Sequence, residues 1–203
     1  MKMPLTDRRG FLKQTGTALT AGAALGAAWE LGSLSVLAGE KPADFAKKTM
    51  KIIIAADPFA VTLKKAVAAY LKEKGHETID LGSTEEKAIP YYECGVDACK
   101  ALQAGKGERA ILFCGTGMGM AIVANRFKGV TAAVVESVFA ARMCRAINNA
   151  NVLCLGSMIW GDWMAKEAVE AFLTTQLTDG LPQFADFLKA ANKKVESIDP
   201  AKP

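Results

Sequence analysis

The chain has a single histidine, His76, and no Cys-x-x-Cys pair. Structural zinc sites draw on clusters of cysteine and histidine, so no such site is expected. No run of lysine and arginine is interleaved with aromatic residues, which argues against a nucleic-acid partner. The cysteines number five, so at least one thiol stays unpaired within one chain.

A long, uniform apolar run is also missing, and the first 40 residues hold only a mildly apolar, glycine-rich stretch. There Arg8 and Arg9 precede a stretch of small uncharged residues that ends in SVLAGE. This order resembles a twin-arginine signal, with cleavage expected after Ala38. We therefore expect a signal peptide over 1–38, a linker over 39–49, and a protein exported to the periplasm by the twin-arginine machinery. An amphipathic helix or a membrane anchor is the competing interpretation.

The remaining chain is large enough for one domain, since 51% of its 203 residues are hydrophobic. Apolar runs alternate with stretches of helical periodicity over 50–195, and 196–203 is expected to be a tail. The apolar runs have no polar face, which is typical of strands covered by helices on both sides. The pattern predicts an α/β fold, a Rossmann-like α/β/α sandwich around a five-stranded parallel sheet. The expected strands are 50–56, 77–82, 109–114, 129–135 and 151–156, and the expected helices are 60–75, 90–106, 118–127, 139–148, 162–176 and 182–194.

The segment CGTGMGMA at 114–121 joins the third predicted strand to a helix. Its glycines allow a tight turn, and the free N–H groups of a helix start attract an anion or a developing oxyanion. Cys114 stands at the strand end beside that helix, a position that favours a thiolate. The lysine of a P-loop is absent, and the glycine spacing differs from the dinucleotide fingerprint. A turn whose glycines serve packing, with a purely structural cysteine, is the alternative interpretation.

Two segments, ILFCGTGMGMAIVANRFKGVTAAVV and INNANVLCLGSMIWGDWMAKEAVEAFL, resemble the ribose-5-phosphate isomerase B and galactose-6-phosphate isomerase family. The resemblance implies an aldose–ketose isomerase that works through an enediolate, without metal or cofactor. It also implies a homodimer, or a dimer of dimers, with active sites between subunits. By the same resemblance, Cys114 is the base that transfers the proton, and Thr116 and the loop N–H groups hold the enediolate oxygens. The catalytic residues implied are Cys114 and Thr116, and the substrate-binding residues are Asp57, Gly115, Gly117, Gly119 and Asn148.

The chain departs from this family at the phosphate end of the site. The family's two histidines are replaced by Pro58 and Ile147, and an Asp-Tyr pair by Ala88 and Ile89. Its phosphate-binding arginine and a later basic pair are replaced by Met158, Leu181 and Ala185. Charge-assisted Arg–phosphate bonds are among the strongest polar contacts, so an intact sugar phosphate should bind weakly in the family's pose.

Three hypotheses follow for the substrate. The first is an exported isomerase of a sugar that carries no phosphate, with Trp160 or Trp163 available for stacking unless they serve packing. The second is a non-catalytic exported homologue that binds a sugar or an anion. The third keeps the sugar phosphate and recruits a new clamp from Arg126, Arg142 or Arg145, which could equally be solvated surface residues.

Overall fold

The computed structural model describes residues 49–198, so the predicted signal peptide and residues 39–48 of the predicted linker lie outside the described residues. Five parallel strands form one sheet in the order β2-β1-β3-β5-β4. They are β1 (Lys51–Ala56), β2 (Glu77–Asp80), β3 (Arg109–Cys114), β4 (Ala132–Val134) and β5 (Val152–Gly156). The predicted five-stranded parallel sheet is confirmed, with each strand matching its expected range or falling short of it by a few residues.

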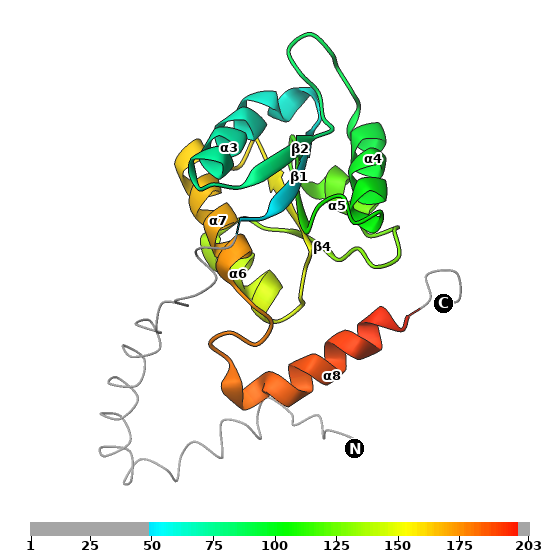
Figure 1. The fold of residues 1–203 in the computed structure, drawn as a ribbon, viewed down its shortest axis with the longest axis vertical. Helices are drawn as coiled ribbons and strands as arrows, with labels where there is room; N and C mark the ends of the chain where they lie inside the picture. Colours follow the sequence, from blue (N-terminus) through cyan, green and yellow to red (C-terminus); the bar gives the residue numbers. More distant parts are fainter. Residues whose placement is uncertain (1–48, 199–203) are drawn as a thin grey trace, which may run out of the picture. The chain divides into compact units, whose positions relative to one another are not determined.

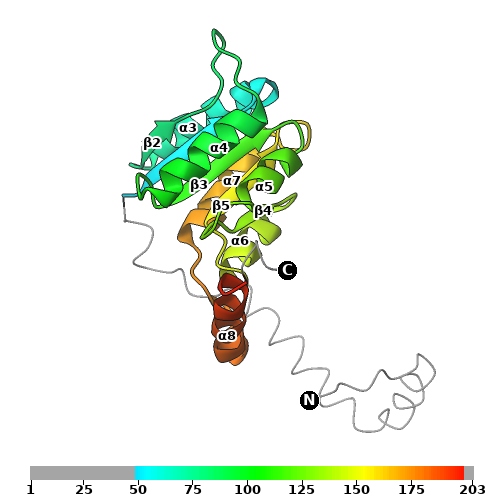
Figure 2. The same ribbon diagram turned by 90° about the vertical axis from the view of Figure 1, so that its right-hand side faces the viewer.

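Helices cover both faces of the sheet. Figure 1 shows α3, α6 and α7 on one face and α4 and α5 on the other, and Figure 2 turns α4 and α5 toward the viewer. The helices are α3 (Val61–Glu73), α4 (Tyr91–Gln103), α5 (Met118–Ala124), α6 (Val138–Ala146), α7 (Asp162–Thr174) and α8 (Ala185–Glu196), with short 3₁₀ turns η2 (Pro58–Ala60) and η3 (Pro182–Phe184). None of the helices within 49–198 is long and apolar enough to cross a membrane.

The strands divide their side chains between two apolar clusters, one on each face. In β1, Ile52 and Ile54 pack with the α3 and α7 side, while Ile53 packs with the α4 and α5 side. All three isoleucines are fully buried, which explains why the strand sequence shows no polar alternation. The side chain of Cys114 belongs to the cluster on the α4 and α5 face.

The strand order places a natural ligand site between β1 and β3. The chain leaves β1 toward β2 on one side and then crosses back to β3 on the other side. Such a reversal opens a crevice beyond the carboxyl ends of the two central strands. Those ends carry Asp57, which follows β1, and Cys114, which closes β3.

Helix α8 lies past the sandwich, on neither face of the sheet (Figures 1 and 2). It buries only Leu188, and its Asn192 donates a hydrogen bond to the carbonyl of Ile147 at 2.8 Å. The large side chains of Phe184 and Phe187, at the start of this helix, are 52% and 70% exposed. Thus α8 keeps an apolar face that the described part of one chain does not cover.

Candidate active site

Asp57 and Cys114 end neighbouring strands at the same edge of the sheet. The register pairs Ala56 with Phe113, and the N–H of Asp57 donates to the carbonyl of Phe113 at 3.1 Å. Asp57 is 7% exposed, and its Oδ1 accepts the N–H of Phe59 at 3.0 Å. Burial raises the pKa of this carboxyl above its usual range, although hydrogen bonds from the backbone of Phe59 and Ala60 oppose the shift.

The loop after Cys114 is held in a closely packed form by the turn after β5. The carbonyls of Cys114 and Gly115 accept the N–H groups of Ser157 and Met158, both at 2.9 Å. A Cβ on Gly156 would lie 2.5 Å from the backbone carbon of Thr116, so only glycine allows the two segments to approach this closely. The turn after β5 therefore fixes the backbone of the loop that follows Cys114.

Gly117 is the N-cap of α5 and gives the loop its turn. Its φ of +81° is in the left-handed region, and a Cβ there would lie 3.1 Å from the backbone of Leu155. In this conformation the N–H of Gly117 points at Sγ of Cys114, at 3.1 Å. The hydroxyl of Thr116 is exposed and accepts the N–H of Met118 at 3.4 Å.

Cys114 differs from Cys94 and Cys144 in the direction of its hydrogen bond. The Cys94 and Cys144 thiols donate to the carbonyls of Ala56 and Ala141, while the Cys114 sulfur accepts an amide N–H. Burial raises the pKa of Cys94 to about 12 and the pKa of Cys144 to about 11, which keeps both protonated. The hydrogen bond to Cys114 instead comes from the backbone of the glycine loop, which links its sulfur to the start of α5.

Comparison with known proteins shows the family to which the chain belongs. The model of the ribose/galactose isomerase family matches residues 52–185. The chain belongs to this family. The chain is 47% identical to a 4-deoxy-4-sulfo-D-erythrose isomerase of Clostridium sp. strain MSTE9, over 74% of this chain and 96% of that protein.

Two further comparisons support the same assignment. The ribose-5-phosphate isomerase B of Escherichia coli is 35% identical over 66% of this chain and 89% of its own length. A ribose 5-phosphate isomerase crystal structure from Thermotoga maritima superposes with a TM-score of 0.67 at 33% identity, covering 74% of this chain and all of that one. The protein is thus an aldose–ketose isomerase.

The surface past the carboxyl end of β5, formed by Met158, Phe59 and Trp163, is apolar and open. We call it the edge beyond β5. Met158 is 70% exposed, and its methyl group lies 3.3 Å from where a Cβ on Gly115 would stand. Phe59 and Trp163 are also exposed, and the hydroxyl of Ser157 donates to the carbonyl of Phe59 at 3.0 Å. Trp160, in contrast, is buried and its indole N–H donates to the carbonyl of Val135, so it packs in the core and cannot stack on a sugar.

The structure separates Asn148 from the other predicted site residues. Asn148 is exposed and follows α6, which runs back from the carboxyl ends of the strands to their amino ends. Cys114 and Asp57 lie at the carboxyl ends, so Asn148 is at the opposite edge of the sheet and does not join them within one chain. Arg145 lies near Asn148, is buried, and donates to the carbonyls of Ala150 and Thr175.

Tyr91 lies beside the loop and was not singled out from the sequence. A Cβ on Gly119 would come within 3.0 Å of its ring, so the ring covers the first turn of α5. The sequence could have pointed to Tyr91 by its position directly after Pro90, at the start of a helix that packs on α5.

Among the described residues, no group of three or more His, Cys, Asp or Glu side chains could hold a metal ion.

Proposed function

We propose that this isomerase interconverts an aldose and a ketose that carry no phosphate, by proton transfer through an enediolate. The observation that carries the proposal is the pairing of a closed, N–H-lined loop at Cys114 with an open apolar edge at Met158. The first can hold the charge that develops on the reacting oxygens. In the second, the exposed side chains that the described residues place there, Met158, Phe59 and Trp163, include no guanidinium for a phosphate.

In this mechanism Cys114 acts as a thiolate and takes the proton from the carbon next to the carbonyl. The electron pair moves onto the carbonyl oxygen, and the loop N–H groups and the Thr116 hydroxyl stabilise the enediolate. The thiol then returns the proton to the neighbouring carbon, while the hydroxyl proton moves between the two oxygens. Asp57, next to Cys114, accepts a hydroxyl of the substrate and holds it in place.

A four-carbon sugar with a sulfonate is the first substrate to test. The relative that is 47% identical is a 4-deoxy-4-sulfo-D-erythrose isomerase. A sulfonate carries one negative charge, where a phosphate monoester carries close to two at neutral pH. It therefore needs less positive charge around it, which suits an edge formed by Met158, Phe59 and Trp163.

We also propose a homodimer, or a dimer of dimers, in which Asn148 of the partner subunit completes the site. Two observations support it: Asn148 is at the wrong edge of its own sheet, and α8 leaves Phe184 and Phe187 exposed. Exposed apolar faces of this kind are typical of subunit interfaces. Sedimentation equilibrium of the purified protein at micromolar concentration tests the assembly, and a monomer would exclude it.

Export to the periplasm by the twin-arginine machinery stays a proposal, supported by Arg8, Arg9 and the small-residue stretch that ends at Ala38. The mass of the protein recovered from the periplasm of an expressing cell tests it. We expect a chain that begins at Gly39, and substitution of both arginines by lysine should leave the full-length chain inside the cell.

The decisive experiment for the reaction uses heavy water. The protein is incubated in D2O with 4-deoxy-4-sulfo-D-erythrose, erythrose, ribose and ribose 5-phosphate, and deuterium at C1 and C2 is measured. We expect exchange with a sugar that lacks phosphate and much less with ribose 5-phosphate. If ribose 5-phosphate is the best substrate, a new clamp exists and exposed Arg142 is the residue to substitute. Ligand-induced stabilisation without any exchange would instead indicate a binding protein.

A further inference from the structure

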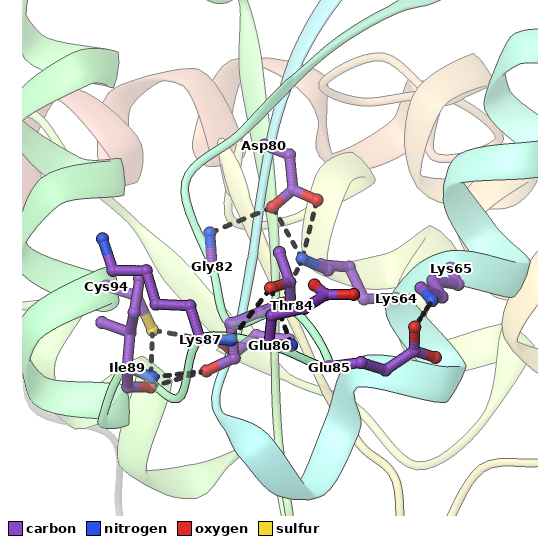
Figure 3. A network of polar contacts seen from close by, with 12 residues as sticks. Lys64, Lys65, Asp80, Gly82, Thr84, Glu85, Glu86, Lys87, Ile89 and Cys94 are labelled. Carbon is purple, nitrogen blue, oxygen red and sulfur yellow. Dashed lines mark hydrogen bonds and ion pairs between the residues drawn. The ribbon is translucent and has the colours of Figure 1, made fainter.

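Lys64 is a cation enclosed on the core side of α3. It is 2% exposed, and its ammonium donates to Oδ1 of Asp80 at 2.8 Å and to the carbonyl of Ser83 at 2.7 Å. Figure 3 shows the Lys64 ammonium directed at the Asp80 carboxylate, which also accepts the N–H of Gly82 at 3.0 Å. A buried ammonium is tolerated only when its donors meet acceptors, so this geometry is strongly constrained.

Of the two partners of Lys64, Asp80 is the last residue of β2, and Ser83 belongs to the segment between β2 and α4, residues 81–90. Ser83 donates its N–H to the carbonyl of Ala56 at 2.8 Å, and its hydroxyl bonds both the N–H and the carbonyl of Ile89. A Cβ on Gly82 would lie 2.2 Å from the backbone nitrogen of Ala56. Lys64 therefore holds the 81–90 segment tightly against the last residue of β1, directly before Asp57.

From there the contacts continue to both parts of the candidate active site. The carbonyl of Ala56 also accepts the thiol of Cys94, on α4, at 3.5 Å. The next residue, Asp57, is hydrogen-bonded to Phe113 beside Cys114. The 81–90 segment leads into α4, whose Tyr91 ring covers Gly119 of the loop.

We propose that Lys64 is a positioning residue for the isomerase reaction: it fixes the 81–90 segment, and through it Asp57 and the loop after Cys114. Lys64 touches no reacting atom. The neighbouring Lys65 provides a contrast, because it also pairs with this segment, through Glu85, yet its side chain is 54% exposed. The inference rests on the proposed function only for its kinetic assay.

The test compares four variants of the full chain with the wild type, using a sugar that the wild type isomerises. Lys64→Met keeps an unbranched side chain, one atom shorter, and removes its charge, while Asp80→Asn weakens one of its two bonds. We expect Lys64→Met to lower kcat/KM by about 10- to 100-fold, the range for small misplacements of reacting groups, with Asp80→Asn between it and the wild type. Lys65→Met, the matched control, should leave kcat/KM unchanged, and Lys64→Arg should recover part of the loss.

A purely structural role would lower the melting temperature while kcat/KM per folded molecule stays at the wild-type value, and that result would overturn the proposal. Equal losses in Lys64→Met and Lys65→Met would overturn it too. If Lys64→Met does not fold, Asp80→Asn decides, and wild-type kinetics in that variant count against positioning.

The proposal and the proposed function can fail separately. If the wild type isomerises no sugar, the function is wrong, and the positioning role is decided by two readouts that need no substrate. These are amide hydrogen exchange over residues 82–91 and the rate of Cys114 alkylation by iodoacetamide. We expect both to be faster in Lys64→Met than in the wild type and Lys65→Met, and equal rates in all three would overturn the proposal.

Discussion

The edge of the sheet around Cys114 and the edge beyond β5 are built in opposite ways. Around Cys114 the surroundings are closed and made of backbone: the thiol is 5% exposed, and Gly156 stands against Thr116 with no room for a side chain. Beyond β5 the edge is open and made of side chains, with Trp163 79% exposed. Reaction chemistry needs fixed donors, whereas substrate choice depends on side chains that can change without disturbing the backbone. Substitutions in the two regions should therefore have different consequences.

The largest effect is expected at Cys114 itself. Cys114→Ala removes the proposed base and should lower kcat by about 10²- to 10⁴-fold, the usual contribution of proton transfer by a side chain. Cys99→Ala is the matched control, since Cys99 is a buried thiol in the same apolar cluster. Its activity should stay near that of the wild type. Steady-state rates decide, and a Cys114→Ala enzyme with at least a tenth of the wild-type kcat would contradict the assignment.

Gly117→Ala should give the next largest effect, because the residue has φ +81° and its Cβ would press on the backbone of Leu155. We expect a loss of activity of about 10²-fold from the displaced N–H, and a lower melting temperature. Gly129→Ala is the control: it has φ +77° but open space around it. It should lose about 1 kcal/mol of stability and keep its activity. Equal activity in the two variants would show that the loop geometry is not critical.

Met158→Arg tests the open edge. A guanidinium at this position should improve kcat/KM for ribose 5-phosphate by about 10-fold or more, as expected for a charge-assisted bond to phosphate. The value for the sugar without phosphate should change little, and Met158→Gln should change neither. Competition between the two sugars in one reaction measures the ratio directly. An equal gain for both sugars would mean that the edge does not select the substrate.

The smallest expected effect is on stability, at Asp57. Burial raises the pKa of this carboxyl in the folded chain, so the native state holds the proton more tightly than the unfolded state. Stability then falls as the pH rises through the window above the ordinary aspartate value, and the loss disappears below it. Asp57→Asn should therefore have a higher free energy of unfolding than the wild type at pH 7, with a smaller difference at pH 4.

Urea titrations at both pH values measure this difference. Asp97→Asn, which removes an exposed carboxylate from α4, should show little effect at either pH. A destabilised Asp57→Asn at pH 7 would mean that the hydrogen bonds to its carboxylate outweigh its burial.

Much of the fold and of the closed edge followed from the sequence, because both depend on local patterns. Continuous apolar runs predicted the strands, and glycines after the third strand predicted the loop. The directions of long polar side chains could not be predicted. Lys64 and Lys65 are adjacent in a helical pattern, and only packing against the 81–90 segment buries one of them. Likewise, nothing in the local sequence indicates that Arg145 turns inward toward backbone carbonyls.

The placement of Asn148 depended on tertiary structure in a different way. Its neighbourhood resembles the family motif, but α6 carries it to the amino ends of the strands, away from Cys114. Sequence comparison assigns residues to a site without saying which subunit supplies them. The sequence also could not tell which of Trp160 and Trp163 is buried, because burial depends on tertiary packing; only Trp163 is exposed.

All five thiols are free and buried in the folded chain. Reagents and oxidants can therefore reach the deepest of them only when the fold opens. The rate at which the buried thiols are oxidised would then report how often the native state opens, rather than the intrinsic reactivity of the thiols. If the protein works outside the cytoplasm, kinetic stability would set how long the deeply buried thiols, such as Cys94, Cys99 and Cys154, stay reduced, and slower unfolding would protect them for longer.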